Sequence, residues 1–153
     1  MNGFNKILVP IDFSERSTSV LRNAVYVAGK FEAELYLIYV VEDFSSTVTF
    51  SVPHISSDIQ DDEMKRGAEK KMENLIEDNL EPSVAPKSKV LVGNVAERIC
   101  SFAKDEEIDL IIMGTHGYKG LERVLLGSVT EKVLRLAHCD VMAVKNFIPE
   151  TEQ

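Results

Sequence analysis

Apolar residues follow two different patterns along this chain, and the two patterns alternate. In five short segments the apolar residues are consecutive, as expected for strands that are covered on both faces of a sheet. Between them, apolar residues recur every three or four positions, which is typical of helices with one buried face. The predicted strands are residues 6–10, 35–41, 87–92, 110–113 and 141–145. This alternation predicts an α/β fold: a mostly parallel sheet with helices on both faces, joined by right-handed crossovers.

Recognisable signals mark the ends of the predicted helices. Ser14, Asn94 and Ser128 stand at the starts of three of them, where a side-chain oxygen can cap free backbone N–H groups. Ser128 is followed three positions later by a glutamate, which completes the capping-box pattern. Gly29 is predicted to end the first helix, and Pro82 and Pro86 to end the second. The predicted inward-facing residues are Val20, Leu21, Ala24, Val25 and Ala28; Met64, Ala68, Met72, Leu75 and Ile76; Ala96, Ile99, Cys100 and Ala103; and Val129, Val133, Leu134 and Ala137.

Residues 42–60 interrupt the alternation. They are rich in Ser and Thr, contain Pro53 and have no clear periodicity, so we predict a long surface loop. We expect this loop to be the element that orders when a ligand binds. The remaining pattern has neither a second composition regime nor an internal repeat. Residues 1–148 are therefore predicted to form one domain, and residues 149–153 a short polar tail.

Composition narrows the classes of function. The chain has 153 residues, 44% of them hydrophobic, and a formal net charge of −8. The negative charge argues against nucleic-acid binding, but a small anionic ligand needs only local backbone donors. No apolar run approaches the roughly 20 residues that span a bilayer, and the N-terminus lacks the layout of a signal peptide, so we expect a cytoplasmic protein. Cys100 and Cys139 have no redox or metal-ligand spacing and are expected to be reduced thiols.

Four glycines (114, 117, 120 and 127) gather between the fourth predicted strand and the last helix. Glycine lets the backbone approach a ligand closely, and a helix N-terminus offers free N–H groups, so the pattern predicts an anion-binding site. Ligands of open parallel sheets bind beyond the carboxyl ends of the strands, where the winding reverses. We therefore expect the end of the first strand, Pro10-Ile11-Asp12, to face Gly114 across one crevice. The glycine spacing fits neither a dinucleotide fingerprint nor a Walker A loop.

The spacing G-x2-G-x9-G-S, formed by Gly114, Gly117, Gly127 and Ser128, resembles the motif of the ATP-binding branch of the universal stress protein family. The segments that resemble the family in the right order are residues 7–14, 37–41, 92–97, 109–114 and 141–145. The resemblance implies a five-stranded parallel sheet of order 3-2-1-4-5. It also implies a homodimer, for which the last strand, Val141 to Lys145, is the expected edge.

The resemblance further implies where an adenine nucleotide would bind. The residues implied at the adenine are Pro10, Ile11, Asp12 and Val40, the last packing on the adenine or bonding to it through its backbone. Those implied near the ribose are Met113 and Gly114. Those implied around the phosphates, mostly through backbone N–H groups and hydroxyls, are His116, Gly117, Gly127, Ser128, Val129 and Thr130. Family members often hold magnesium or manganese on the phosphates themselves, so ATP with either ion is the implied ligand.

The chain departs from the family pattern in two places. Phe13 stands where a glycine often follows the aspartate, and we expect it to alter the mouth of the pocket. His138 and Asp140 replace prolines that often flank the position of Cys139. The second change concerns a turn and leaves the nucleotide site untouched.

Several candidate residues have a structural interpretation beside the functional one. Asp12 either accepts a hydrogen bond from the adenine amino group or caps the helix that follows. Ser128 either contacts phosphate or caps its own helix, and one residue can do both. His116 is either a phosphate donor or an exposed loop residue, and it lacks a second metal ligand at a suitable spacing.

The sequence leaves three functions open. The first is an ATP-binding regulatory or sensor protein in a stress response, which the intact glycines favour. The second is a protein-interaction module that keeps the fold with an empty site. The third is a true hydrolase or transferase. Because Asp12 is the one candidate acid at the expected site, without an evident base or arginine finger, we expect at most slow hydrolysis.

Overall fold

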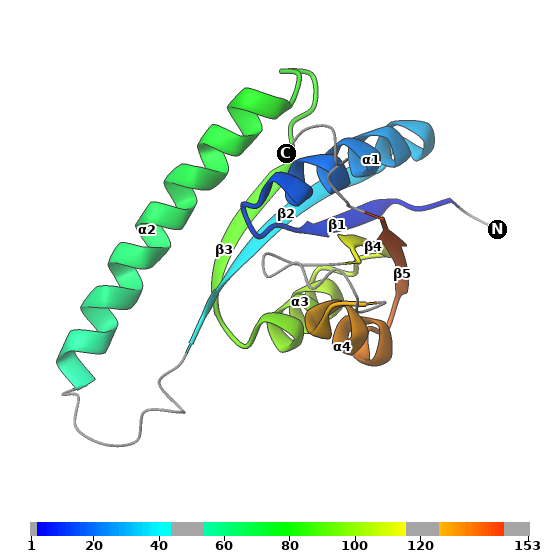
Figure 1. Ribbon diagram of the computed structural model, residues 1–153. Helices are drawn as coiled ribbons and strands as arrows, with labels where there is room; N and C mark the ends of the chain where they lie inside the picture. The colour runs from blue at the N-terminus through cyan, green and yellow to red at the C-terminus, as the bar shows by residue number, and fades with distance from the viewer. Residues whose placement is uncertain (1–2, 44–53, 116–125, 146–153) are drawn as a thin grey trace, which may run out of the picture.

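Five parallel strands form one sheet with the spatial order β3-β2-β1-β4-β5 (Figure 1). The computed structural model describes residues 3–43, 54–115 and 126–145. The strands are β1 (Lys6–Pro10), β2 (Glu34–Glu42), β3 (Lys87–Gly93), β4 (Leu110–Gly114) and β5 (Asp140–Val144). The helices within the described residues are α1 (Glu15–Phe31), α2 (His54–Asn79), α3 (Val95–Asp105) and α4 (Ser128–Leu136). Both the α/β class and the strand order are as predicted.

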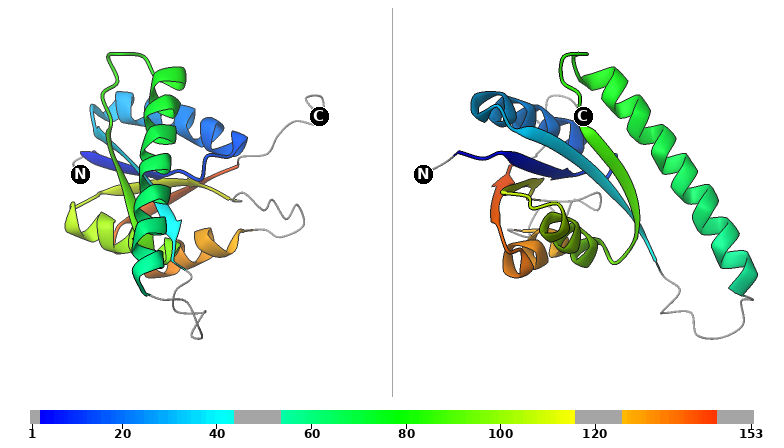
Figure 2. Two further views of the ribbon diagram at one scale, coloured as in Figure 1. Left: turned by 90° about the vertical axis from the view of Figure 1, so that its left-hand side faces the viewer. Right: turned by 180° about the vertical axis from the view of Figure 1, so that it is seen from behind.

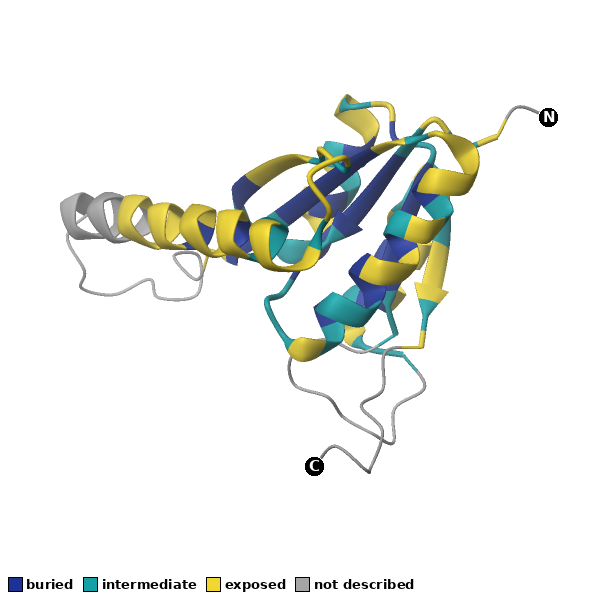
Figure 3. Ribbon diagram, turned by 90° about the horizontal axis from the view of Figure 1, so that it is seen from above, coloured by how far each residue is buried: buried dark blue, intermediate teal, exposed yellow. Residues whose placement is uncertain are grey.

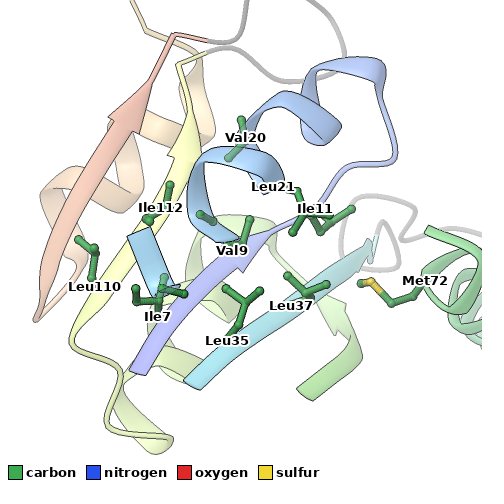
Figure 4. Packing of buried hydrophobic residues seen from close by; sticks show 12 residues of the cluster. Ile7, Val9, Ile11, Val20, Leu21, Leu35, Leu37, Met72, Leu110 and Ile112 are labelled. Carbon is green, nitrogen blue, oxygen red and sulfur yellow. The ribbon is translucent and has the colours of Figure 1, made fainter. Parts of the chain in front are cut away.

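Each face of the sheet has its own buried cluster, because side chains along a strand alternate between the faces. Ile7 and Val9 of β1 belong to the cluster covered by α1 and α2, which includes Met72 (Figure 4). Leu8, between them, belongs to the opposite cluster, with Val133 of α4. Figure 2 shows α1 on one side of the sheet and α3 and α4 on the other. The strands are thus buried between two helical layers, which explains their consecutive apolar residues.

Helix α1 has the predicted start but a later end. Ser14 is its N-cap, and the Ser14 hydroxyl accepts a backbone N–H of the first turn at 3.3 Å. The helix continues past Gly29 to Phe31. Glu32 then adopts a left-handed conformation (φ 54°), and its N–H donates to the carbonyl of Ala28. The predicted end at Gly29 is wrong because this backbone cap terminates the helix without a glycine.

The prediction of a loop over residues 42–60 is wrong at both ends. Glu42 is the last residue of β2, and residues 54–60 are the first turns of α2. Residues 44–53 lie outside the described residues. The sequence around the start of α2 is mostly polar, so it carries little of the apolar periodicity that identifies helices. Pro53, directly before the helix, is compatible with a helix start because a proline there forfeits no helical hydrogen bond.

Within the described residues, α2 packs on the sheet through its C-terminal part. Ala68 and Met72 are buried, as predicted, but Met64 is 56% exposed. Figure 3 shows the exposed part of α2 extending beyond the sheet. The sequence periodicity that predicts a buried Met64 does not show how far along α2 the contact with the sheet extends.

The last helices and strand need small corrections. Asn94 caps α3 as predicted, and its Oδ1 accepts the N–H of Glu97 at 3.1 Å. Leu134 of α4, predicted to be buried, is 42% exposed. The buried face of this short helix includes Val133, and the next residue points about 100° away from it. β5 begins at Asp140 and is the edge strand beyond β4.

Two further expectations concern membrane-spanning helices and the two cysteines. No helix in the described parts of the chain is both long enough and apolar enough to cross a membrane. Cys100 and Cys139 are free, half-buried thiols, and burial raises the pKa of both. A raised pKa lowers the fraction of reactive thiolate at neutral pH.

Candidate functional site

The carboxyl ends of β1 and β4 are neighbours at one edge of the sheet. β1 pairs in parallel with β4, with Ile7 opposite Leu110, and on its other side with β2. The chain winds outward in both directions from this pair of strands, so the edge is the switch point at which such sheets bind ligands. We call the region formed by Asp12, Gly114 and the N-terminus of α4 the site edge. The term refers to the carboxyl ends of the strands and not to an outermost strand such as β5.

Asp12 follows β1 and is held by its own chain. Its Oδ1 accepts hydrogen bonds from the Ser14 N–H at 3.0 Å, the Ser14 hydroxyl at 2.6 Å and the Ser17 hydroxyl. The Asp12 N–H donates back to the Ser17 Oγ at 3.1 Å. Asp12 thus stabilises the start of α1, although Ser14, not Asp12, is the N-cap. Its other carboxylate oxygen, Oδ2, takes no hydrogen bond among the described residues and remains available to a ligand.

The contribution of Ser17 was missed by the sequence interpretation. Ser17 is 6% exposed, and its hydroxyl reaches back from the first turn of α1 to Asp12. The one signal in the sequence is the spacing of Asp12, Ser14 and Ser17. Serines at this spacing are ordinary in the first turn of a helix, so the spacing by itself does not identify the contact.

Phe13, the residue in place of the family's usual glycine, has a left-handed backbone (φ 61°). This conformation is easy for glycine and strained for a bulky side chain. The ring packs 4.5 Å from the ring of Tyr39, and the Nζ of Lys71 lies 5.8 Å from its centroid. The Phe13 side chain therefore packs between β2 and α2, and this packing stabilises its left-handed backbone conformation.

The residues implied at the adenine differ in what they expose. Pro10 is the last residue of β1, and Ile11 is 5% exposed in the core, so Ile11 can offer a ligand only its backbone. Val40 lies within β2, and its side chain is buried. Ile38 accepts the Ile11 N–H at 2.8 Å, and backbone groups two residues apart point to the same side of a strand. The backbone N–H and C=O of Val40 therefore point towards the side of β2 on which β1 lies, at a level beyond Ile11.

Two hydrogen bonds tie α4 to the end of β4. The Thr130 hydroxyl donates to the Gly114 carbonyl at 2.8 Å, and the Gly127 N–H donates to the Thr115 carbonyl at 2.7 Å. Thr130 is 3% exposed, so its hydroxyl supports the fold instead of facing solvent. Met113, implied near the ribose, is 6% exposed in the core on the α3 and α4 face. Neither contact of the tether was predicted.

The predicted capping box at Ser128 is wrong. The N-cap is Gly127, which has an extended backbone and forms no side-chain cap, and Ser128 is the first helical residue, with an exposed side chain. The first intrahelical bond runs from the Glu131 N–H to the Gly127 carbonyl at 3.0 Å. The N–H groups of Ser128, Val129 and Thr130 therefore have no acceptor within the helix. They point outward at the positive end of the helix dipole.

Part of the implied phosphate site lies outside the described residues. His116 and Gly117 belong to residues 116–125, for which the structure gives no description. Among the residues that are described, no group of three His, Cys, Asp or Glu side chains could hold a metal ion. The described part of the site edge is thus built of backbone donors and the Asp12 carboxylate.

An open depression lies at the opposite edge of the sheet. Its lining consists of Lys104, Glu107, Ile108, Asp109, His138, Cys139 and Asp140. These residues surround the amino ends of β4 and β5, whereas ligands of open parallel sheets bind at the carboxyl ends. We therefore do not assign the depression to the site.

Comparisons with known proteins agree with this architecture. The model of the universal stress protein family matches residues 3–145. Universal stress protein MJ0531 of Methanocaldococcus jannaschii is 40% identical over 146 residues, which cover 94% of this chain and 84% of the relative. The solved structure of MJ0577, from the same organism, has a TM-score of 0.80 and 31% identity, and the match covers 95% of this chain and 99% of MJ0577.

A more distant solved structure shares the fold. The universal stress protein of Archaeoglobus fulgidus in complex with dAMP has a TM-score of 0.56 and 19% identity, and the match covers 95% of this chain and all of that one (100%). The wound sheet, its site edge and a family match over nearly the whole chain lead to the same conclusion. The chain belongs to the universal stress protein family.

Proposed function

We propose that this protein binds ATP at the site edge, and that the bound nucleotide regulates or reports a stress response. The observation that carries the proposal is the N-terminus of α4, which has no side-chain cap and is tethered to the end of β4. Asp12 follows the adjacent strand, so an anion-binding helix end and a carboxylate acceptor lie at one edge.

The phosphates would bind at α4. A phosphate accepts hydrogen bonds from N–H groups and is stabilised by the positive end of a helix dipole. The N–H groups of Ser128, Val129 and Thr130, which have no acceptor among the described residues, have this chemistry, and Gly127 has no side chain that would block them. Such backbone donors let a protein of net charge −8 bind an anion without a basic surface.

The adenine would bind beside Asp12. The free Oδ2 of Asp12 can accept a hydrogen bond from the adenine amino group, and the backbone of Val40 points to the space beyond the end of β1. The two groups flank the end of Pro10-Ile11, so the base would lie over the carboxyl ends of β1 and β2. A magnesium or manganese ion would be held by the phosphate oxygens, since these hard ions prefer oxygen ligands.

We propose binding with slow hydrolysis at most. Rapid phosphoryl transfer requires a positioned base and charge stabilisers beside the transferred group. Asp12 Oδ1 accepts three hydrogen bonds within its own turn, and Oδ2 would face the adenine and not the phosphates, so Asp12 is a poor candidate for that base. The alternative, an interaction module with an empty site, predicts no nucleotide affinity at all.

The nucleotide content of the purified protein tests this proposal. The protein is denatured, and any released small molecule is identified by absorbance and mass. Bound ATP or ADP, or binding of added ATP by protein freed of nucleotide, supports the proposal. Protein that neither carries nor takes up adenine nucleotide would support the empty interaction module instead.

A further inference from the structure

We infer that Ser17 is a positioning residue that makes the site selective for 6-amino purines over 6-oxo purines. The inference rests on the proposed function and adds a base class and a residue to it. Ser17 would not touch the nucleotide. It would act by fixing the orientation of the Asp12 carboxylate, so that one oxygen faces the base.

Ser17 contacts Asp12 at two points. The Ser17 hydroxyl donates to Asp12 Oδ1 and accepts the Asp12 backbone N–H at 3.1 Å. One buried hydroxyl, in a residue 6% exposed, thus holds both the main chain and the side chain of Asp12. A carboxylate turned part of the way, or moved to another rotamer, would leave this buried hydroxyl without its acceptor. A buried polar group without a partner destabilises the protein by its cost of desolvation. The two contacts together restrict Asp12 to one orientation.

Three hydrogen bonds to Oδ1 leave Oδ2 as the carboxylate oxygen without a hydrogen bond among the described residues. Oδ1 accepts from the Ser14 N–H, the Ser14 hydroxyl and the Ser17 hydroxyl, which fills its lone pairs. Oδ2 is left as an acceptor without a proton to donate. A 6-amino group can donate to Oδ2, whereas a 6-oxo group would set two acceptors against each other. The fixed carboxylate therefore favours adenine over hypoxanthine.

Ser17 is the more important of the two serines for this role. Ser14 is the helix N-cap, and its Oγ also accepts the Ser17 N–H at 3.3 Å, so its hydroxyl serves the helix as well. Ser17 is more deeply buried and forms the reciprocal pair of bonds with Asp12. Removing the Ser17 hydroxyl would take away one of the three bonds to Oδ1 and the bond to the Asp12 N–H, so the carboxylate would be held less firmly, and it would leave the N-cap in place.

Binding of ATP and inosine triphosphate to wild type, Ser17→Ala and Asp12→Asn tests the inference. The two nucleotides differ at position 6 of the purine and at the neighbouring N1, which carries a proton only in the 6-oxo base. Wild type should prefer ATP by about tenfold, as expected for one hydrogen bond to a charged group. In Ser17→Ala, ATP affinity should fall by about threefold to tenfold and inosine triphosphate affinity should change by less than about twofold, so the preference shrinks. Ser19→Ala, on the same helix, is the matched control and should behave as wild type.

Asp12→Asn provides a second test that keeps all three donors. These donors need an oxygen at the Oδ1 position, so the new amide nitrogen must take the place of Oδ2. There it would donate to a 6-oxo group, and the preference should invert to favour inosine triphosphate by about tenfold. This variant keeps the proposal testable where Ser17→Ala unfolds.

The outcomes separate the possible failures. Equal loss of both nucleotides in Ser17→Ala, with a lowered melting temperature, would make Ser17 merely structural. An unchanged preference in Ser17→Ala, or no inversion in Asp12→Asn, would also overturn the inference while leaving ATP binding intact. Wild type that binds neither nucleotide would overturn the proposed function and this inference together.

Discussion

The Thr130 hydroxyl donates to the carbonyl of Gly114 across 2.8 Å, and this bond sets the start of α4 against the end of β4. Thr130 is 3% exposed, so the bond is shielded from water. Thr130→Val keeps the shape and removes the donor, leaving the Gly114 carbonyl without this partner. We expect the free energy of unfolding to fall by about 1–3 kcal/mol and the affinity for ATP to decrease.

Urea denaturation monitored by circular dichroism measures the first effect, and titration with ATP the second. Thr18→Val on α1 is the matched control, because it makes the same chemical change outside the site edge. If Thr130→Val were as stable as Thr18→Val and bound ATP equally well, the tether would not organise the site.

The left-handed backbone of Phe13 predicts that a glycine variant is more stable than an alanine variant at this position, the reverse of the usual order. Phe13→Ala and Phe13→Gly both lose the ring contact with Tyr39, but only glycine relieves the strain at φ 61°. Phe13→Gly should therefore be more stable than Phe13→Ala by about 1 kcal/mol in urea denaturation. At Val25, inside α1, glycine should be less stable than alanine by about 0.5–1 kcal/mol. The same order at both positions would contradict the left-handed conformation of Phe13.

The exposed edge of β5 predicts self-association. Met142 is 38% exposed on this edge strand, and an unprotected edge readily pairs with another strand. We expect a homodimer through β5, measurable by light scattering after size exclusion. Met142→Lys should give monomers, because charges on edge strands oppose pairing. Met64→Lys, which adds the same charge to exposed α2, should leave the dimer intact. A monomeric wild type, or a dimer that survives Met142→Lys, would refute this interface.

The contact of β2 with β3 predicts a local pH dependence. The Tyr36 hydroxyl donates to Glu34 at 3.0 Å and the Lys87 Nζ lies 3.3 Å from the same carboxylate, and both lower the pKa of Glu34 from its ordinary value of 4.5. The stabilisation is therefore present above pH 4.5 and is lost as the pH falls through the lowered pKa. Lys87 has a raised pKa, because its ammonium donates hydrogen bonds to Tyr36 and Glu34, so its contribution is lost only as the pH rises through that raised value.

Carboxyl-carbon NMR measures this effect directly. The pKa of Glu34 should rise towards its ordinary value in Tyr36→Phe, which removes one hydrogen bond, and in Lys87→Met, which removes a hydrogen bond and a neighbouring positive charge. A Glu34 pKa that is the same in wild type and both variants would show that the contact does not form in solution.

Most of the fold could be predicted from the sequence, because buried parallel strands are recorded as consecutive apolar residues. The errors occur at helix ends, where the backbone conformation of single residues, or polar sequence, determines the boundary. The start of α2 lies in polar sequence, where helical periodicity is weak, and the end of α1 depends on Glu32 adopting a conformation usual for glycine. At α4, the capping-box pattern does not show that Gly127 rather than Ser128 has the extended backbone.

The candidate site was predictable in outline but not in its supporting contacts. Adjacent ends of β1 and β4 follow from the order of the elements, and Asp12 stands at one of them. The bonds from Ser17 to Asp12 and from Thr130 to Gly114 depend on how helices settle on the sheet. No spacing of residues specifies such a contact in advance.

The measurement that tests ATP binding at the α4 N-terminus most directly compares Ser128→Pro with Ser128→Ala. Proline is well tolerated at the first helical position and removes its N–H, and the extended Gly127 (ψ 157°) suits a residue before proline. Alanine removes only the hydroxyl. Calorimetry should show ATP binding by wild type, an effect of less than about threefold in Ser128→Ala, and a loss of about tenfold or more in Ser128→Pro, with adenosine affinity unchanged in both. Absence of ATP binding by wild type, or equal ATP affinity in the two variants, would contradict the account.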